Sequence, residues 1–153
     1  MQKKILPYLL MILSLAGFLD STYLTLEHYA NRIPPCTIVH GCEQVLTSKY
    51  ASFHSVPTAL FGAAYYVFVF LTTIVCLSLE NKRLLRILGY FTITGFLASL
   101  WFVYLQAFVI RSYCQFCLLS ALTSTLIFIT GIAIVRQLRL SPPFKPLPEE
   151  EKL

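Results

Sequence analysis

Long apolar runs separated by short polar connections dominate the chain. Four runs have the roughly 20 residues that an α-helix needs to cross about 30 Å of hydrocarbon, and they cover residues 7–27, 57–79, 85–110 and 115–135. Lys3 and Lys4 precede the first run as in a secretory signal, but no small-residue cleavage site follows, so we interpret the run as a retained anchor. The pattern predicts an all-α membrane protein, a bundle of four transmembrane helices.

Small and polar residues recur in these runs at three- and four-residue steps, which places them on one face of each helix. Such faces are the usual contacts between membrane helices, because small side chains let the backbones approach. Asp20 and Gln106 would cost more free energy in hydrocarbon than these small side chains do, so we expect both to face inward or to lie near the interface. For Asp20, helix packing and a role in a site both stay open. The small and polar faces comprise Ser14, Gly17, Ser21, Thr25 and His28 in the first run and Thr92, Gly95 and Ser99 in the third.

Composition and charge place the chain in a bilayer and give it an orientation. Apolar residues make up 57% of the 153 residues and charged residues only 12%, which is not typical of a soluble domain. The net charge of +5 is not gathered on a basic face, so we exclude nucleic-acid binding. Nine of the twelve Lys and Arg residues lie before the first run, between the second and third or at the very start of the third (Arg86), or after the fourth. By the positive-inside rule both termini are cytoplasmic, and residues 28–56 and 111–113 lie on the outer side of a bacterial inner (plasma) membrane.

The end of the chain differs from the rest in composition. Residues 137–153 contain several prolines and an acidic run, and we predict a disordered cytoplasmic tail there. Residues 1–136 then form the multi-pass membrane domain.

Four of the five cysteines form two close pairs on the predicted outer side, which is oxidising in bacteria. The fifth, Cys76, lies within an apolar run and is excluded from the site. Cys114 and Cys117 form a C-x-x-C motif at the start of the fourth helix, where three residues rise by about 4.5 Å, so Cys117 lies on the same side but deeper. The positive end of the helix dipole favours a thiolate there. Redox use, a structural disulfide and a metal site all fit this motif taken alone.

Cys36 and Cys42 enclose five residues in the first outer loop, beside two prolines and a glycine. Such a pair can close as a small disulfide and open again, as a relay between a partner and a buried pair requires. Because exchange proceeds by thiolate attack on a disulfide sulfur, Cys36 or Cys42 must then reach Cys114. Two alternatives stay open: a non-catalytic membrane scaffold with structural disulfides, or a tetrahedral zinc site with His40 as a spare ligand. The five-residue gap is wider than the usual zinc spacing, so we predict no metal.

The face below Cys117 continues through Ser120 and Ser124 to Gly131. It could form an inward groove of small groups for a flat, apolar electron acceptor, although a packing face has the same appearance.

Taken together, the motifs resemble the bacterial branch of the vitamin K epoxide reductase family. The C-x5-C motif, Ser48 six residues after Cys42, and the later C-x-x-C have the order and spacing of that family. The resemblance covers about residues 8–136. The residues around the motifs agree as well: Tyr23-Leu24, Glu27-His28, the 56–62 entry to the second helix, and 113–119.

This resemblance implies a four-helix bundle in which an outer loop with a short helix covers a quinone site. The implied activity is that of a thiol:quinone oxidoreductase that supports disulfide-bond formation, with ubiquinone, menaquinone or phylloquinone as acceptor. It implies that Cys36 exchanges with a thioredoxin-fold partner and that Cys42 passes the electrons on to Cys114. Cys117 then acts next to the quinone, and Ser48 matches a serine on the helix that covers the site.

Two departures from the family pattern qualify these implications. Many bacterial relatives carry a thioredoxin-like domain after the bundle, whereas this chain continues for 17 residues after Arg136, so we expect a separate exported DsbA-like partner. The vertebrate enzymes have Thr-Thr-Tyr after the second active cysteine, and this chain has Leu118-Leu119-Ser120-Ala121, which argues against epoxide turnover. A second family of quinone-linked, disulfide-forming bundles has the two cysteine motifs in the reverse order and fits less well.

Overall fold

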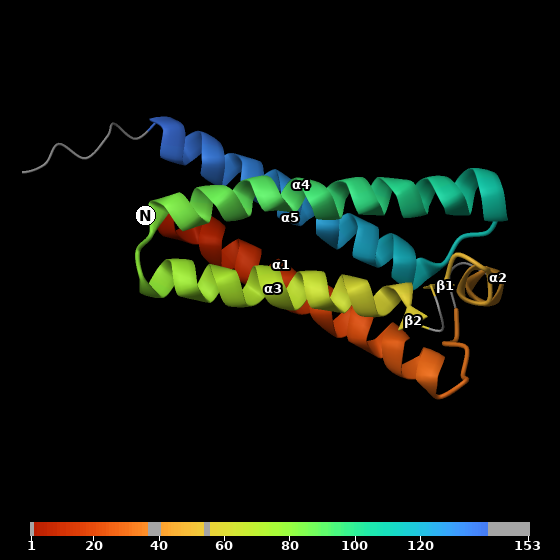
Figure 1. Ribbon diagram of the computed structural model, residues 1–153. Coiled ribbons are helices and arrows are strands. Elements are labelled where there is room, and N and C mark those ends of the chain that lie inside the picture. Colours follow the sequence, from red (N-terminus) through yellow and green to blue (C-terminus); the bar gives the residue numbers. More distant parts are fainter. Residues whose placement is uncertain (1, 37–40, 54–55, 141–153) are drawn as a thin grey trace, which may run out of the picture.

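Four long helices make up most of the protein in the computed structural model, which describes residues 2–36, 41–53 and 56–140 (Figure 1). Each of the four is long and apolar enough to cross a membrane. The predicted all-α fold is therefore confirmed. The helices are α1 (Gln2–Tyr29), α3 (Thr58–Ser78), α4 (Lys82–Tyr104), which continues as the π-helix η1 (Leu105–Ile110), and α5 (Gln115–Leu140).

Three of these helices extend beyond the predicted spans at the end that carries most basic residues. α1 begins at Gln2 rather than at residue 7, α4 begins at Lys82 rather than at 85, and α5 ends at Leu140 rather than at 135. Lysine and arginine are good helix formers whose long side chains reach water from a helix end, so the helix does not stop where the apolar run does. Residues 137–140 of the predicted tail are thus helical, and the predicted disorder of 141–153 lies outside the described residues.

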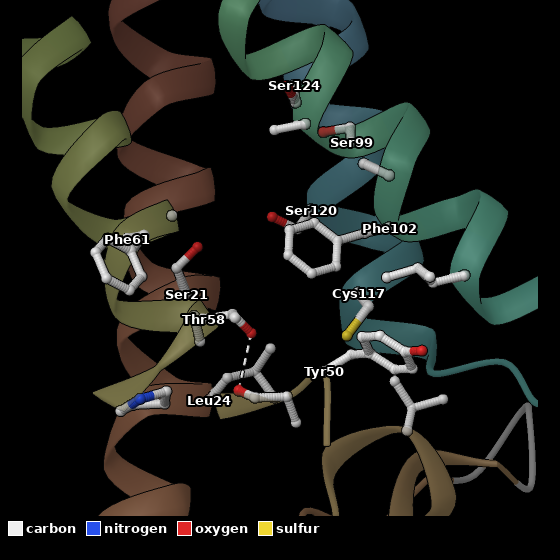
Figure 2. A pocket seen from close by; sticks show the side chains of 18 of the residues that line it. Ser21, Leu24, Tyr50, Thr58, Phe61, Ser99, Phe102, Cys117, Ser120 and Ser124 are labelled. Carbon is white, nitrogen blue, oxygen red and sulfur yellow. Dashed lines mark hydrogen bonds between the residues drawn. The ribbon is translucent and has the colours of Figure 1, made fainter. Parts of the chain in front are cut away.

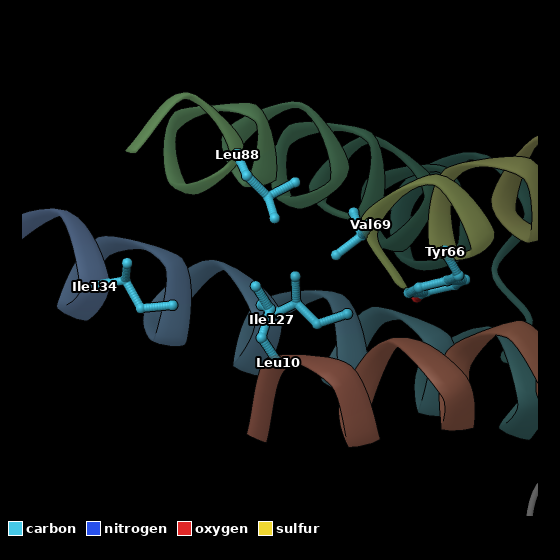
Figure 3. Close-up of a cluster of buried hydrophobic side chains, with 6 residues drawn as sticks. All are labelled: Leu10, Tyr66, Val69, Leu88, Ile127 and Ile134. Carbon is cyan, nitrogen blue, oxygen red and sulfur yellow. The ribbon is translucent and has the colours of Figure 1, made fainter. Parts of the chain in front are cut away.

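The helices pack around α5 and α1. α5 lies along α4 and α1, α1 also lies along α3, and α3 and α4 contact each other much less. A cluster of buried side chains lies inside the bundle, and apolar residues from all four helices meet there (Figure 3). The cluster consists of Leu10, Tyr66, Val69, Leu88, Ile127 and Ile134.

Small residues bring the backbones of α4 and α5 together, as the sequence predicted for the Thr92 face. A Cβ added at Gly131 would lie 2.5 Å from Thr92 Oγ1 and 3.1 Å from the Gly89 carbonyl oxygen, too close for a real side chain. Ser14 and Ser21 of α1 are likewise buried. Ser14 of α1 and Thr92 of α4 therefore lie on packing faces. Other members of the two predicted faces line a cavity instead: Ser21, His28, Gly95 and Ser99.

A short helix and a two-stranded ribbon cover the opposite end of the bundle, where α1 ends and α5 begins (Figure 1). We call this the cysteine end. The cover consists of α2 (Cys42–Leu46) and the antiparallel strands β1 (Ser52–Phe53) and β2 (Val56–Pro57). Thr58 fastens the ribbon to α3, because its backbone N–H and its hydroxyl both donate to the Ala51 carbonyl oxygen at 2.9 Å.

Candidate active site

The first cysteine pair is a disulfide at the cysteine end. The Cα atoms of Cys36 and Cys42 are 6.2 Å apart; Cys42 begins α2 and is buried, whereas Cys36 is half-buried. Gly41 brings α2 close to the segment before α5, since a Cβ added there would lie 2.6 Å from the Tyr113 carbonyl oxygen. Cys42 is thereby held beside the second pair. The candidate ligand His40 lies outside the described residues.

The second cysteine pair opens α5 with two free thiols. Cys114 directly precedes the helix, and its carbonyl oxygen accepts the Leu118 N–H at 3.0 Å, so it is the capping residue. Cys114 is fully buried. Cys117 lies one turn into the helix and is half-buried.

The two pairs meet in one buried cluster. Cys42, Val45 and Cys114 form its centre, and Cys36 and Cys117 pack against it. Two motifs more than 70 positions apart in the sequence therefore share one site. This contact is the arrangement that thiol–disulfide exchange between Cys42 and Cys114 requires.

Cys114 is the activated thiol of the second pair. A hydrogen bond from the Cys117 thiol lowers the pKa of Cys114 from its ordinary value of 9.0 to about 7, against burial, which raises the pKa. The backbone N–H groups of Cys117 and Phe116 lower the pKa further. These are the first amides of α5, so the predicted stabilisation of a thiolate at this helix start has a concrete source. The lowered pKa favours the thiolate of Cys114, which is the nucleophilic form of a thiol.

A cavity of about 490 Å³ lies beneath the cover and is lined by all four long helices and by α2 and the loop after it. Figure 2 shows the Cys117 side chain at this cavity, with Ser120 and Ser124 farther along the same helix. Its walls are mainly apolar, with Leu24 and Phe102 among them. A free thiol of the second pair thus faces a space of ligand size.

The model of the vitamin K epoxide reductase family matches residues 8–132. The chain belongs to the vitamin K epoxide reductase family. The match includes both cysteine pairs and Ser48, and it confirms the resemblance recognised in the sequence. Membership supports an oxidoreductase whose activity is related to quinones, and the four apolar helices fit a multi-pass membrane protein.

The cavity of this vitamin K epoxide reductase family member fits a quinone ring. Its volume lies within the roughly 300–1,000 Å³ of typical ligand pockets, and its apolar walls suit such a ring. Two lining hydroxyls, Tyr65 OH and Ser124 Oγ, are buried and have no hydrogen-bond partner among the described residues. Since buried hydroxyls normally find partners, these two are available to the carbonyl oxygens of a quinone.

Ser48 follows α2 and lines the cavity. Its hydroxyl donates to the Val45 carbonyl oxygen at 2.7 Å, near the end of that short helix. Ser48 therefore stabilises the cover, and its oxygen can still accept a hydrogen bond.

Of the three small residues below Cys117, the structure brings two to the cavity. Ser120 and Ser124 line it, whereas Gly131 packs against α4. Tyr66 was not singled out in the sequence, and its hydroxyl donates to the Ser120 carbonyl oxygen at 2.8 Å and lies 3.0 Å from Ser120 Oγ. A tyrosine in an apolar run has no local signal for a partner 54 positions away.

Both polar residues singled out within the spans face inward. Gln106 is 2% exposed and lines the cavity. Asp20 is half-buried, and its Oδ2 atom is buried without a hydrogen-bond partner in the described part of the chain. The cost of that burial keeps a site role open for Asp20.

The zinc alternative gains no support. Within residues 2–36, 41–53 and 56–140, no group of three or more His, Cys, Asp and Glu side chains lies close enough together to hold a metal ion. The Cys36–Cys42 disulfide also engages two of the four sulfurs that the zinc site would use.

Proposed function

We propose that this protein is a thiol:quinone oxidoreductase that supports disulfide-bond formation. Electrons from the dithiol of a separate exported thioredoxin-fold protein, of the DsbA-like class, enter at Cys36 and Cys42. They pass to Cys114 and Cys117 and leave to a membrane quinone. One observation carries the proposal: Cys114 lies against the Cys36–Cys42 disulfide while its neighbour Cys117 faces the cavity.

The relay begins at Cys36, the more exposed cysteine of the first pair. A thiolate of the partner attacks it, the Cys36–Cys42 bond breaks, and a mixed disulfide forms. The second thiolate of the partner then releases Cys36, so the partner leaves oxidised and the first pair is reduced by two electrons.

Exchange between the pairs follows within the buried cluster. The Cys42 thiolate attacks Cys114 of a Cys114–Cys117 disulfide, and Cys117 leaves as a thiolate. Cys36 then attacks Cys42, which restores the first disulfide and frees Cys114. The resulting state, with Cys36–Cys42 oxidised and two free thiols at α5, is the state of the present structure.

A quinone bound in the cavity would accept the two electrons and two protons that Cys114 and Cys117 release when their disulfide forms again. The protein's part is to position and enclose the quinone. The apolar walls exclude water, and the Tyr65 and Ser124 hydroxyls supply hydrogen bonds to it. The lining suits ubiquinone, menaquinone and phylloquinone alike.

The distribution of basic residues supports an orientation with the cysteine end on the outer side of the membrane. Lys82 and Arg83 lie at the opposite end of the bundle, as do Lys3 and Lys4, which the positive-inside rule places in the cytoplasm. The first pair then meets its partner in the oxidising compartment.

The test is oxidation of a reduced thioredoxin-fold dithiol by purified protein with a soluble naphthoquinone analogue. We expect Cys117→Ser to abolish turnover, because no Cys114–Cys117 disulfide can form. The matched control Cys76→Ser alters a buried cysteine of α3 at the far end of the bundle and should keep the parent rate. Oxidation by Cys117→Ser at the parent rate would instead favour a scaffold with structural disulfides.

A further inference from the structure

Gln106 reaches from the end of the α4–η1 helix to the backbone of Cys114. Its Oε1 atom accepts the Cys114 N–H at 2.9 Å, and the side chain is 2% exposed. A buried amide in a membrane helix is costly unless it is hydrogen-bonded, so this contact accounts for its presence.

The main chain of Gln106 holds the same connection. Its carbonyl oxygen accepts the N–H groups of Arg111 and Ser112, the latter at 3.1 Å. Arg111 adopts a left-handed conformation with φ of 55°, which turns the chain out of the π-helix and toward α5. Short π-helical segments are frequent at functional sites. The main-chain and side-chain carbonyl groups of Gln106 therefore both hold the segment that leads to Cys114.

The contact with Gln106 bears directly on the Cys114 sulfur. Holding the Cys114 N–H restrains the peptide plane that precedes its Cα, and this limits how far the Cα–Cβ bond and the sulfur can turn. Cys114 must face two sulfurs in turn, Cys42 of the cover and Cys117 of its own helix, and it packs against both. A small rotation of its backbone would move the sulfur away from one of them.

We propose that Gln106 is a positioning residue for exchange between the two cysteine pairs. Its hydrogen bond holds Cys114 where the side chain packs against the Cys36–Cys42 disulfide. This inference rests on the proposed relay and adds to it a residue that carries no redox chemistry of its own.

The exchange step can be isolated in a Cys117→Ser background. The Cys114 thiolate attacks Cys42, the Cys36–Cys42 bond breaks, the Cys42–Cys114 bond forms, and Cys36 leaves as a thiolate. No further oxidant is needed, since one disulfide replaces another. The trapped disulfide is measured by mass spectrometry after acid quenching and alkylation of the freed Cys36.

Two substitutions at position 106 separate the hydrogen bond from packing. Gln106→Met keeps the length of the side chain and removes the carbonyl acceptor, and we expect the rate of trapping to fall at least about tenfold, which corresponds to roughly 1.4 kcal/mol. Gln106→Glu keeps a carbonyl oxygen at the same place and should restore most of the rate. Gln44→Met is the control, because Gln44 contacts Ser112 of the same connection from an exposed position and should leave trapping near the parent rate.

The outcomes distinguish the inference from the relay itself. Failure of Cys117→Ser to trap any Cys42–Cys114 disulfide would overturn the relay. Trapping at equal rates with Gln or Met at position 106 would leave the relay standing and refute the positioning role. Equal losses in the Met and Glu variants would also refute it, because they would point to general loss of packing.

Discussion

Serine and alanine at position 117 differ by one hydrogen-bond donor next to Cys114, and this difference should change the pH at which Cys114 reacts. In the parent, hydrogen bonding from Cys117 is the largest influence that lowers the pKa of Cys114 to about 7. Serine keeps a donor and alanine does not, whereas neither variant can form the Cys114–Cys117 disulfide. Burial, which raises the pKa, then meets only the backbone N–H groups as opposition in the alanine variant, and the pKa should return toward the ordinary 9.0.

The size of the effect follows from two opposing factors. A fall in pKa from 9.0 to about 7 favours the thiolate by roughly 3 kcal/mol. At pH 7 it raises the thiolate fraction from about 1% to about half, roughly fiftyfold. A more acidic thiol is intrinsically a weaker nucleophile, by about eightfold over this range for a Brønsted coefficient of about 0.45. The net expectation at pH 7 is a rate about sixfold higher for Cys117→Ser than for Cys117→Ala.

The order of the two rates reverses at alkaline pH. Above the higher pKa both variants are fully ionised, only the intrinsic factor remains, and Cys117→Ala should then be several-fold faster. The assay is the rate at which the Cys42–Cys114 disulfide forms between pH 5.5 and 10, read from the alkylation of freed Cys36. The rate of the serine variant should rise through about pH 7, and the rate of the alanine variant should rise about two pH units higher. Superimposable profiles would refute the assignment of Cys117 as the group that activates Cys114.

Two further predictions concern packing and orientation. Gly131→Ala should lower the stability of the bundle by about 1–3 kcal/mol, because the added Cβ would meet Thr92 and the Gly89 backbone. Thermal unfolding in detergent measures this loss. The control Gly62→Ala, whose nearest contact would be the Ser21 hydroxyl at 3.2 Å, should be nearly neutral. After mild reduction of intact cells, a membrane-impermeant maleimide should label Cys36, and labelling only after the membrane is broken would reverse the proposed orientation.

The sequence by itself determined the helices and the local character of the second cysteine pair. In hydrocarbon every backbone N–H and C=O must be satisfied within the segment, so apolar runs of sufficient length form helices whatever surrounds them. The helix start at Gln115 similarly determines the electrostatic environment of Cys114 and Cys117, because the free N–H groups belong to the first turn itself. Ser120 and Ser124 line the cavity because they follow Cys117 at helical spacing, which decides between the two possibilities that the sequence left open.

Contacts between elements were decided only by the tertiary structure. The meeting of Cys42 with Cys114, the hydrogen bond from Cys114 to Gln106 and the contact of Tyr66 with Ser120 depend on the rotation of each helix and on its approach to its neighbours. Gly131 shows the same dependence, since a small residue can face a cavity or another backbone, and the close crossing of α4 and α5 assigned it to the backbone of α4. A pattern along the chain gives the spacing of residues on one helix, but packing of all four helices sets which faces meet and therefore where the sulfur atoms gather.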